Sequence, residues 1–210
     1  WLHKFANGKE RRLSATPGFF TSPVFTPNGR QILALRSSND ARMHSYMEYG
    51  ATRDASLVAM PVRGGVETVI HNGSIGGTPH FDGDNRTVLI NRYDGVYRLP
   101  LSGGAAQKIV GVQGPGWYFA EGRAQADDIR ISPDGREALV RIAQQLTLIA
   151  LPARGADIDL SDPALVRRRL TDEGADFMAW SADGKTIGWS IGSTWHERAR
   201  DGIVLAPGKA

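Results

Sequence analysis

One short turn sequence occurs four times along this chain, and it constrains the fold more than any other feature. Each copy has a large apolar residue, a four-residue turn, a basic residue and then an apolar run. The third copy reads Ser-Pro-Asp-Gly at residues 132–135. Proline fixes φ, serine and aspartate hydrogen-bond to nearby backbone groups, and glycine supplies a positive φ, so each copy predicts a β-hairpin. The residues that carry the turn pattern are Asn28, Gly29, Asp84, Asn85, Asp134, Gly135, Asp183 and Gly184. Asn85 replaces glycine in the second copy, and asparagine tolerates the left-handed conformation that the turn needs.

The copies are about 50 residues apart, and a second hairpin follows each of the first three. Four antiparallel strands in about 50 residues are typical of one propeller blade. The spacing therefore predicts an all-β fold, a β-propeller built of four-stranded antiparallel blades. The apolar residues before the turns, which we call the anchors, are predicted to be buried at equivalent positions, and the strand after each turn is predicted to be buried on both faces. The anchors are Phe25, Phe81, Ile131 and Trp180.

The repeat predicts a single β-propeller region over residues 1–210, with about four blades' worth of sequence. We expect it to be part of a larger propeller; alternatively, Arg11–Leu13 joins the sheet of Ile187–Ser190 and closes a composite blade. Two stretches with some helical character, 40–49 and 163–169, are expected to be insertions. The expected blades are 1–13 (partial), 14–70, 71–110, 111–170 and 171–210 (partial).

Composition excludes several classes of protein. At 41% hydrophobic residues the chain can bury a core, and its lack of cysteine excludes disulfides, thiolate metal sites and cysteine nucleophiles. No apolar run is long enough to cross a bilayer, so no membrane span is expected. A net charge of +3 without a clustered basic patch predicts no nucleic-acid partner. The basic run 167–169 is interpreted as a solvated blade edge.

The repeated turn resembles the PD40 (WD40-like) repeat of TolB-like β-propellers. More narrowly, residues 126–136, 144–148 and 169–193 are similar to the propeller that precedes certain bacterial amidohydrolase domains. This resemblance implies a periplasmic or secreted protein. It also implies that a metal-dependent hydrolase domain, with its divalent metal, lies outside this chain.

No catalytic, cofactor-binding or metal-binding residue is predicted within the chain itself. None of its five histidines forms the His-x-His pair of the amidohydrolases. His196 and Glu197 begin like a zinc-protease motif, but Arg200 stands where the second histidine is required. The chain is therefore expected to be non-catalytic and to need no cofactor. The aromatic run Trp117, Tyr118 and Phe119 occupies no repeat position, and we interpret it as a candidate ligand or interdomain contact.

Two functions remain open from the sequence. In one, the region is an accessory or substrate-gating domain whose partner is the missing catalytic domain. In the other, it is a free-standing TolB-like periplasmic module that binds a protein or a peptide. In either case a partial propeller leaves one blade face uncovered, with apolar residues such as Ile187, Trp189 and Ile203, and self-association through that face is expected if nothing else covers it.

Overall fold

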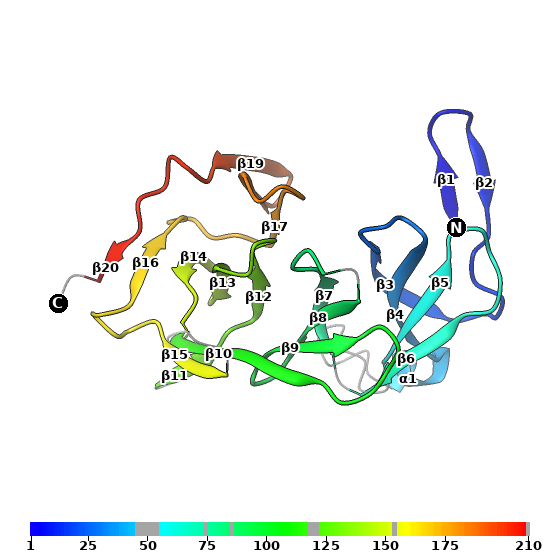
Figure 1. Ribbon diagram of the computed structural model, residues 1–210, viewed down its shortest axis with the longest axis horizontal. Helices are drawn as coiled ribbons and strands as arrows, with labels where there is room; N and C mark the ends of the chain where they lie inside the picture. The colour runs from blue at the N-terminus through cyan, green and yellow to red at the C-terminus, as the bar shows by residue number, and fades with distance from the viewer. Residues whose placement is uncertain (45–54, 74, 85, 117–121, 153–154, 209–210) are drawn as a thin grey trace. The chain divides into compact units, whose positions relative to one another are not determined.

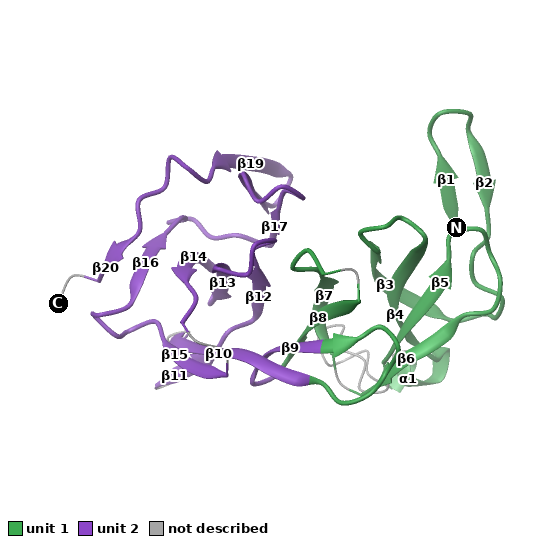
Figure 2. Cartoon of the chain, viewed as in Figure 1, with its two compact units in different colours: residues 1–92, 99–106 green, residues 93–98, 107–210 purple. Residues whose placement is uncertain are grey.

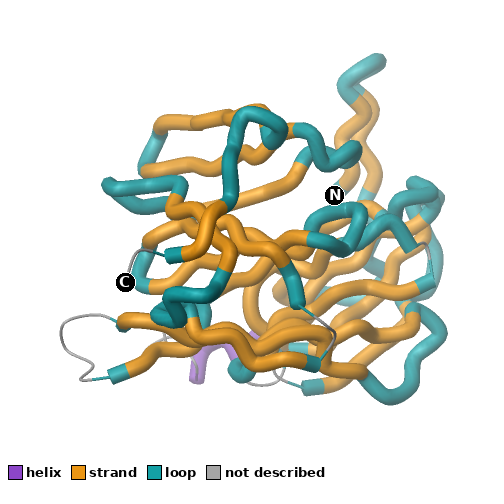
Figure 3. Tube along the Cα trace, turned by 60° about the vertical axis from the view of Figure 1, so that its left-hand side comes forward, coloured by secondary structure: helices purple, strands orange, loops and turns teal. Residues whose placement is uncertain are grey.

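Almost all of the regular structure is β-strand, which confirms the all-β prediction. The computed structural model describes residues 1–44, 55–73, 75–84, 86–116, 122–152 and 155–208. Within these ranges there is one short helix, α1 (Asn39–His44), and every other element is a strand (Figure 3). No helix in the described residues is long and apolar enough to span a membrane.

The chain divides into two compact units (Figure 2). Unit 1 contains residues 1–92 and 99–106, and unit 2 contains residues 93–98 and 107–210. Each unit is described by itself.

Unit 1 begins with a two-stranded sheet and continues with a complete blade (Figure 1). Strands β1 and β2 pair only with each other, and β3 to β6 form an antiparallel sheet in chain order. The hairpin β7–β8 supplies the first half of the second blade. The strands are β1 (Leu2–Lys4), β2 (Lys9–Arg11), β3 (Phe19–Phe25), β4 (Gln31–Ser37), β5 (Ser56–Pro61), β6 (Thr68–Asn72), β7 (Gly76–His80) and β8 (Thr87–Arg92).

Unit 2 contains the rest of the repeat. Strands β9, β10 and β11 are antiparallel neighbours, whereas β15 lies parallel to β10. The third blade has the order β12-β13-β14-β16-β20, and the fourth sheet has the order β17-β18-β19. The strands are β9 (Gly95–Pro100), β10 (Gln107–Pro115), β11 (Arg123–Gln125), β12 (Asp128–Ile131), β13 (Glu137–Ile142), β14 (Gln145–Ala150), β15 (Ala156–Asp159), β16 (Val166–Arg169), β17 (Phe177–Trp180), β18 (Thr186–Ile191), β19 (Thr194–Ala199) and β20 (Ala206–Pro207).

The sheets confirm the predicted four-stranded antiparallel blades, and they correct one reading of the sequence. Residues 163–169, considered as a helix, end in strand β16, because backbone pairing with β14 satisfies the peptide groups of this segment. Of the other candidate stretch, residues 40–44 belong to α1, and 45–49 lie outside the described residues. The larger propeller, and the alternative of a composite blade from the two ends, stay predictions.

The strand after each turn is buried, as predicted. One residue from each of these strands illustrates it, since all four side chains are 0% exposed: Leu33, Leu89, Leu139 and Ile187. These strands form the centres of the blades.

The anchors are less uniform than predicted. Ile131 is 3% exposed, Trp180 and Phe81 are half-buried, and Phe25 is 52% exposed. The prediction that all four are buried equivalents is therefore wrong for Phe25. Trp180 shows how an anchor is covered, because its Nε1–H donates to the carbonyl of Arg130 in the preceding blade, at 3.0 Å.

The first blade is covered in a different way. A cluster of Leu13, Ile32, Ala34 and Met60, with Leu2 packed against it, buries one face of the β3–β6 sheet. Phe25 is not part of this cluster, and it stays exposed. The burial of an anchor depends on which structural element packs against it, and the residues around the anchor in the sequence do not specify that element.

Candidate functional site

The repeated turn is built by one hydrogen-bond network. In the third blade the Ser132 hydroxyl donates to Asp134 Oδ1 at 2.6 Å and accepts from the Glu137 amide at 3.0 Å. Asp134 Oδ1 also accepts from the Arg136 amide, at 3.1 Å. Gly135 has a φ of 73°, which a residue with a Cβ adopts only under strain. The turn therefore closes through its own side chains, and the basic residue after it points into solvent.

The other copies repeat this arrangement. In the fourth blade Ser181 donates to Asp183 at 2.7 Å, and in the first Thr26 donates to Asn28 at 2.8 Å. In the second, Asp84 Oδ1 accepts from the amide of Arg86 at 2.8 Å, whereas Asn85 lies outside the described residues. The glycines of the first and fourth turns also have positive φ, 65° for Gly29 and 70° for Gly184.

The hydroxyls of the turn have an electrostatic effect. The hydrogen bond from Ser132 lowers the pKa of Asp134, and that from Ser181 lowers the pKa of Asp183. Both aspartates are therefore held as carboxylates at neutral pH, with their charge already used in hydrogen bonds. This is the chemistry of a structural cap, since a general acid or base needs a pKa close to the working pH.

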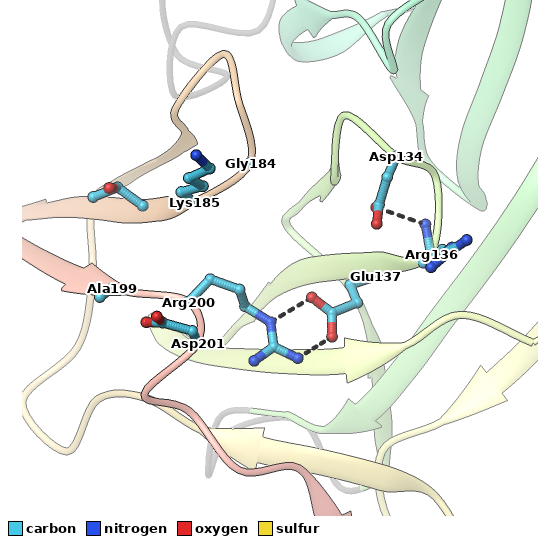
Figure 4. Close-up of a pocket in the computed structure, with 9 residues that line it drawn as sticks. Asp134, Arg136, Glu137, Gly184, Lys185, Ala199, Arg200 and Asp201 are labelled. Carbon is cyan, nitrogen blue, oxygen red and sulfur yellow. Dashed lines mark hydrogen bonds and ion pairs between the residues drawn. The ribbon is translucent and has the colours of Figure 1, made fainter.

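A charged cleft of about 700 Å³ lies beside two of these turns in unit 2 (Figure 4). The third blade contributes the end of its turn and the start of β13, and the fourth blade contributes its turn and the end of β19. Six of the nine lining residues are charged. The lining residues are Asp134, Arg136, Glu137, Gly184, Lys185, Thr186, Ala199, Arg200 and Asp201.

One ion pair occupies the floor of this cleft. Arg200 Nε donates to Glu137 Oε2 at 2.5 Å, and Arg200 Nη2 donates to Glu137 Oε1. Arg200 Nη1 also donates to the carbonyl of Ile203 at 2.8 Å. The hydrogen bond with Glu137 raises the pKa of Arg200, and the two nitrogens of its guanidinium hold the carboxylate in a two-point contact. The side chains of Arg136 and Lys185 are exposed at the rim, where their charge can attract an acidic group, and Lys185 Nζ lies 4.0 Å from Asp183 Oδ2.

A second polar cluster ties the inserted strand β15 to β10. Lys108 Nζ lies 2.8 Å from Asp157 Oδ1 and 3.5 Å from Asp94 Oδ2, and the Tyr97 hydroxyl donates to Asp94 at 2.7 Å. The hydrogen bond to Asp157 raises the pKa of Lys108, and the one from Tyr97 lowers the pKa of Asp94. At Gly111 a Cβ would lie 2.8 Å from the backbone carbonyl oxygen of Asp94 and would also meet the Asp157 carboxylate, so this position requires glycine. These charges are satisfied by each other and hold a strand in place.

The histidine near the failed zinc-protease motif has a structural environment. The ring of His196 stacks on Trp189 with centroids 5.5 Å apart and planes within 10°. A cleft of about 240 Å³ beside it is lined also by Asp172 and Glu173. In the described part of the chain, no group of three or more histidine, aspartate or glutamate side chains is placed to hold a metal ion.

The candidate contact Trp117, Tyr118 and Phe119 lies outside the described residues. The sequence reading missed both the charged cleft and the Lys108 cluster. The repeat includes the basic residues Arg136 and Lys185 that lie at the rim of the cleft. Glu137 and Arg200, however, are far apart in the sequence, and no sequence motif links them.

Solved structures with the same fold were found. An oligogalacturonate lyase, solved in complex with manganese, superposes with a TM-score of 0.56 at 14% identity over 91% of this chain. The chain has a β-propeller fold. The propeller is similar also to the periplasmic gluconolactonase PpgL of Pseudomonas aeruginosa (TM-score 0.47, 16% identity, 92% of this chain). TolB from Acinetobacter baumannii matches with a TM-score of 0.44 at 18% identity over 90% of this chain.

The propeller spans about half the length of these solved chains, 52%, 55% and 43% in the same order. No family model matches the sequence, and no curated protein matches it. At these identities the likeness establishes the fold alone.

Proposed function

We propose that this region is a non-catalytic, TolB-like propeller that serves as an accessory or substrate-gating domain for a metal-dependent hydrolase domain outside the chain. The observation that carries the proposal is the repeated turn, whose serine, aspartate and glycine are all used to build blades. The similarity of residues 126–193 to amidohydrolase-associated propellers supplies the partner class. The proposal includes a periplasmic or secreted location, which the TolB-like repeat supports.

The charges of the cleft beside the third and fourth turns support binding rather than turnover. Glu137 and Arg200 are locked to each other, and the hydroxyl of Ser132 keeps the pKa of Asp134 low. A nucleophile needs an adjacent base that is free to accept its proton. The exposed cations Arg136 and Lys185 instead suit a docking contact with an acidic group of a neighbouring domain or substrate.

The alternative function is a free-standing periplasmic module that binds a protein or peptide. It is favoured by the fourth sheet, where Phe177 is 75% exposed and Trp195 is 55% exposed on strands next to the same central strand. Exposed aromatic side chains of this kind are enriched at protein interfaces.

Two measurements test the accessory role. The reading frame that contains this chain is expected to continue into a barrel with a His-x-His motif, and a frame that stops soon after residue 210 would favour the alternative. The purified chain is expected to show no amide or ester hydrolysis with added Zn²⁺ or Mn²⁺. Robust turnover that disappears on a single histidine or aspartate substitution would show that the chain itself is catalytic.

A further inference from the structure

One position of the repeat changes its chemistry in the fourth blade. The residue after the third strand of each blade donates its amide to the carbonyl of the basic turn residue, and these hydrogen bonds mark equivalent positions. The donating residues are Val62, Leu101, Leu151 and Arg200, and all four are half-buried. Three of them are aliphatic, so the fold itself does not need an arginine here.

The residue that pairs with Arg200 also departs from the repeat. Glu137 follows the basic residue of the third turn, and the same position holds Gln31, Thr87 and Thr186 in the other blades. Replacing a partly buried ion pair by uncharged residues that pack well is often neutral or stabilising. Stability alone therefore does not account for Arg200 and Glu137, and this favours a role in binding.

Arg200 keeps part of its hydrogen-bonding capacity unused. A guanidinium has five N–H donors. Nε and Nη2 of Arg200 each donate to Glu137, and Nη1 donates to the carbonyl of Ile203. The other two N–H groups have no acceptor in the part of the chain that the structure describes, and the side chain lines the charged cleft. The three contacts fix the guanidinium, so the two remaining donors are held in place for an acceptor from outside.

The carboxylates of the cleft are largely occupied. Asp134 accepts from the hydroxyl and the amide of its own turn, at 2.6 Å and 3.1 Å. Both oxygens of Glu137 accept from Arg200 (Figure 4). Asp201 is exposed, and of the lining carboxylates it alone accepts no hydrogen bond from a described residue. The acceptors of the cleft therefore have little capacity left for a ligand.

The cations at the rim differ from these carboxylates. The side chains of Arg136 and Lys185 are both exposed. Lys185 Nζ is 4.0 Å from the Asp183 carboxylate, which is beyond hydrogen-bond distance. The unused hydrogen-bonding groups of the cleft are therefore mainly donors on cationic side chains, and an anion complements them.

We infer that the cleft beside the third and fourth turns is a carboxylate-binding site, in which Arg200 binds the carboxylate through its two remaining N–H groups and Arg136 and Lys185 attract it from the rim. A guanidinium matches a planar carboxylate at two points. A single negative charge suits the cleft better than a phosphate dianion, because three carboxylates also line it. The volume of about 700 Å³ is in the range of small-ligand sites.

This site rests on the accessory role proposed above, because it names the residue and the ligand chemistry of that role's docking contact. The accessory role is judged by the reading frame and by hydrolysis, whereas the site is judged by binding to the chain itself. The two failures are therefore distinguishable.

Two carboxylate probes test the site on the complete chain. Glutarate represents a free organic acid, and a tri-glutamate peptide with blocked ends represents an acidic segment of a neighbouring domain. We expect both to bind, with NMR shift changes at the amides of residues 185 and 200. Tighter binding of the peptide would identify a polypeptide segment as the source of the carboxylate, and equal or weaker binding would identify a free acid. Tighter binding of inorganic phosphate than of glutarate would overturn the carboxylate assignment.

A double variant separates binding from stability. Arg200→Leu with Glu137→Thr restores the residue types of the second blade, Leu101 and Thr87. Its unfolding midpoint should equal or exceed that of the wild-type protein. Its affinity for glutarate should fall by about tenfold or more, because the hydrogen bonds to a charged group are lost. Absence of glutarate binding to the wild-type protein, or unchanged affinity in the double variant, would overturn the inference.

Charge reversal at the rim gives a second readout on a surface position. Lys185→Glu should weaken glutarate binding by about threefold or more. Arg30→Glu is the matched control, since Arg30 is exposed at the equivalent position of the first turn and does not line the cleft. It should change the affinity by less than about twofold. Equal effects of the two reversals would mean that glutarate responds only to the net charge of the chain, and the site would be rejected.

Discussion

Replacing Trp180 by alanine should destabilise unit 2 by about 3 kcal/mol. Full burial of an aromatic side chain makes its truncation to alanine cost about 3–5 kcal/mol, and Trp180 is only half-buried, so about 2 kcal/mol is expected from packing. Its indole also donates to the carbonyl of Arg130, and loss of such a hydrogen bond adds about 1 kcal/mol. Urea unfolding followed by circular dichroism measures the total, and the thermal midpoint should fall by roughly 6–12 °C for a chain of this size.

The same strand supplies the control. Phe177 lies three residues earlier in β17 and is 75% exposed, so Phe177→Ala should change stability by less than about 0.5 kcal/mol. Trp180→Phe keeps most of the packing and removes the indole N–H, and should cost about 1 kcal/mol. If Trp180→Ala and Phe177→Ala had equal effects, the contact between the third and fourth blades would not be the source of stability.

Three further predictions follow from the turns, the inserted strand and a buried carboxylate. Ser132→Ala should destabilise the fold by about 1 kcal/mol near neutral pH and less in acid. The reason is that the pKa of Asp134 is lower in the folded protein than in the unfolded chain. The stability that this difference contributes is present above the unfolded-state pKa and is lost as the pH falls through the folded-state pKa. Urea unfolding between pH 7 and pH 2 measures this loss. Gly111→Ala should destabilise unit 2, because its Cβ would collide with the backbone carbonyl of Asp94 and meet the Asp157 carboxylate. Faster hydrogen exchange at 156–159 would report a loosened β15. Burial raises the pKa of Asp128, so the stability that this shift contributes is present below about pH 4 and is lost as the pH rises through the folded-state pKa. Asp128→Asn should remove this pH dependence. Parallel curves of unfolding free energy against pH for the variant and the wild type would contradict the prediction.

The blades could be predicted from the sequence because their turns are local. Ser132, Asp134 and Gly135 make all of their turn contacts within six residues, so the residue types alone specify the hairpin. The apolar runs that follow indicate buried strands, as Leu139 and Ile187 show. Local chemistry repeated four times was sufficient for the architecture.

The remaining features depend on contacts that no local pattern encodes. Strand β15 is short and polar, and it pairs with residues almost 50 positions away, so it had no strand signal of its own. The ion pair between Glu137 and Arg200 joins residues 63 positions apart. Phe25 and Ile131 occupy the same position of the repeat, but Phe25 is exposed and Ile131 is buried, so the repeat position alone does not determine burial.

The parallel pairing of β15 with β10 has a consequence for the order of folding. Strand β15 follows β14 in the chain, so β10 cannot gain this partner until the strands β12 to β14 have been synthesised. Long-range parallel contacts form slowly, because the intervening loop must close first. A force applied to the ends of the chain should therefore not peel β10 away from the third blade. Strand β10 and the β12–β16 sheet should rupture as one mechanical unit in single-molecule pulling, because β15 lies between β14 and β16 in the chain and pairs with β10.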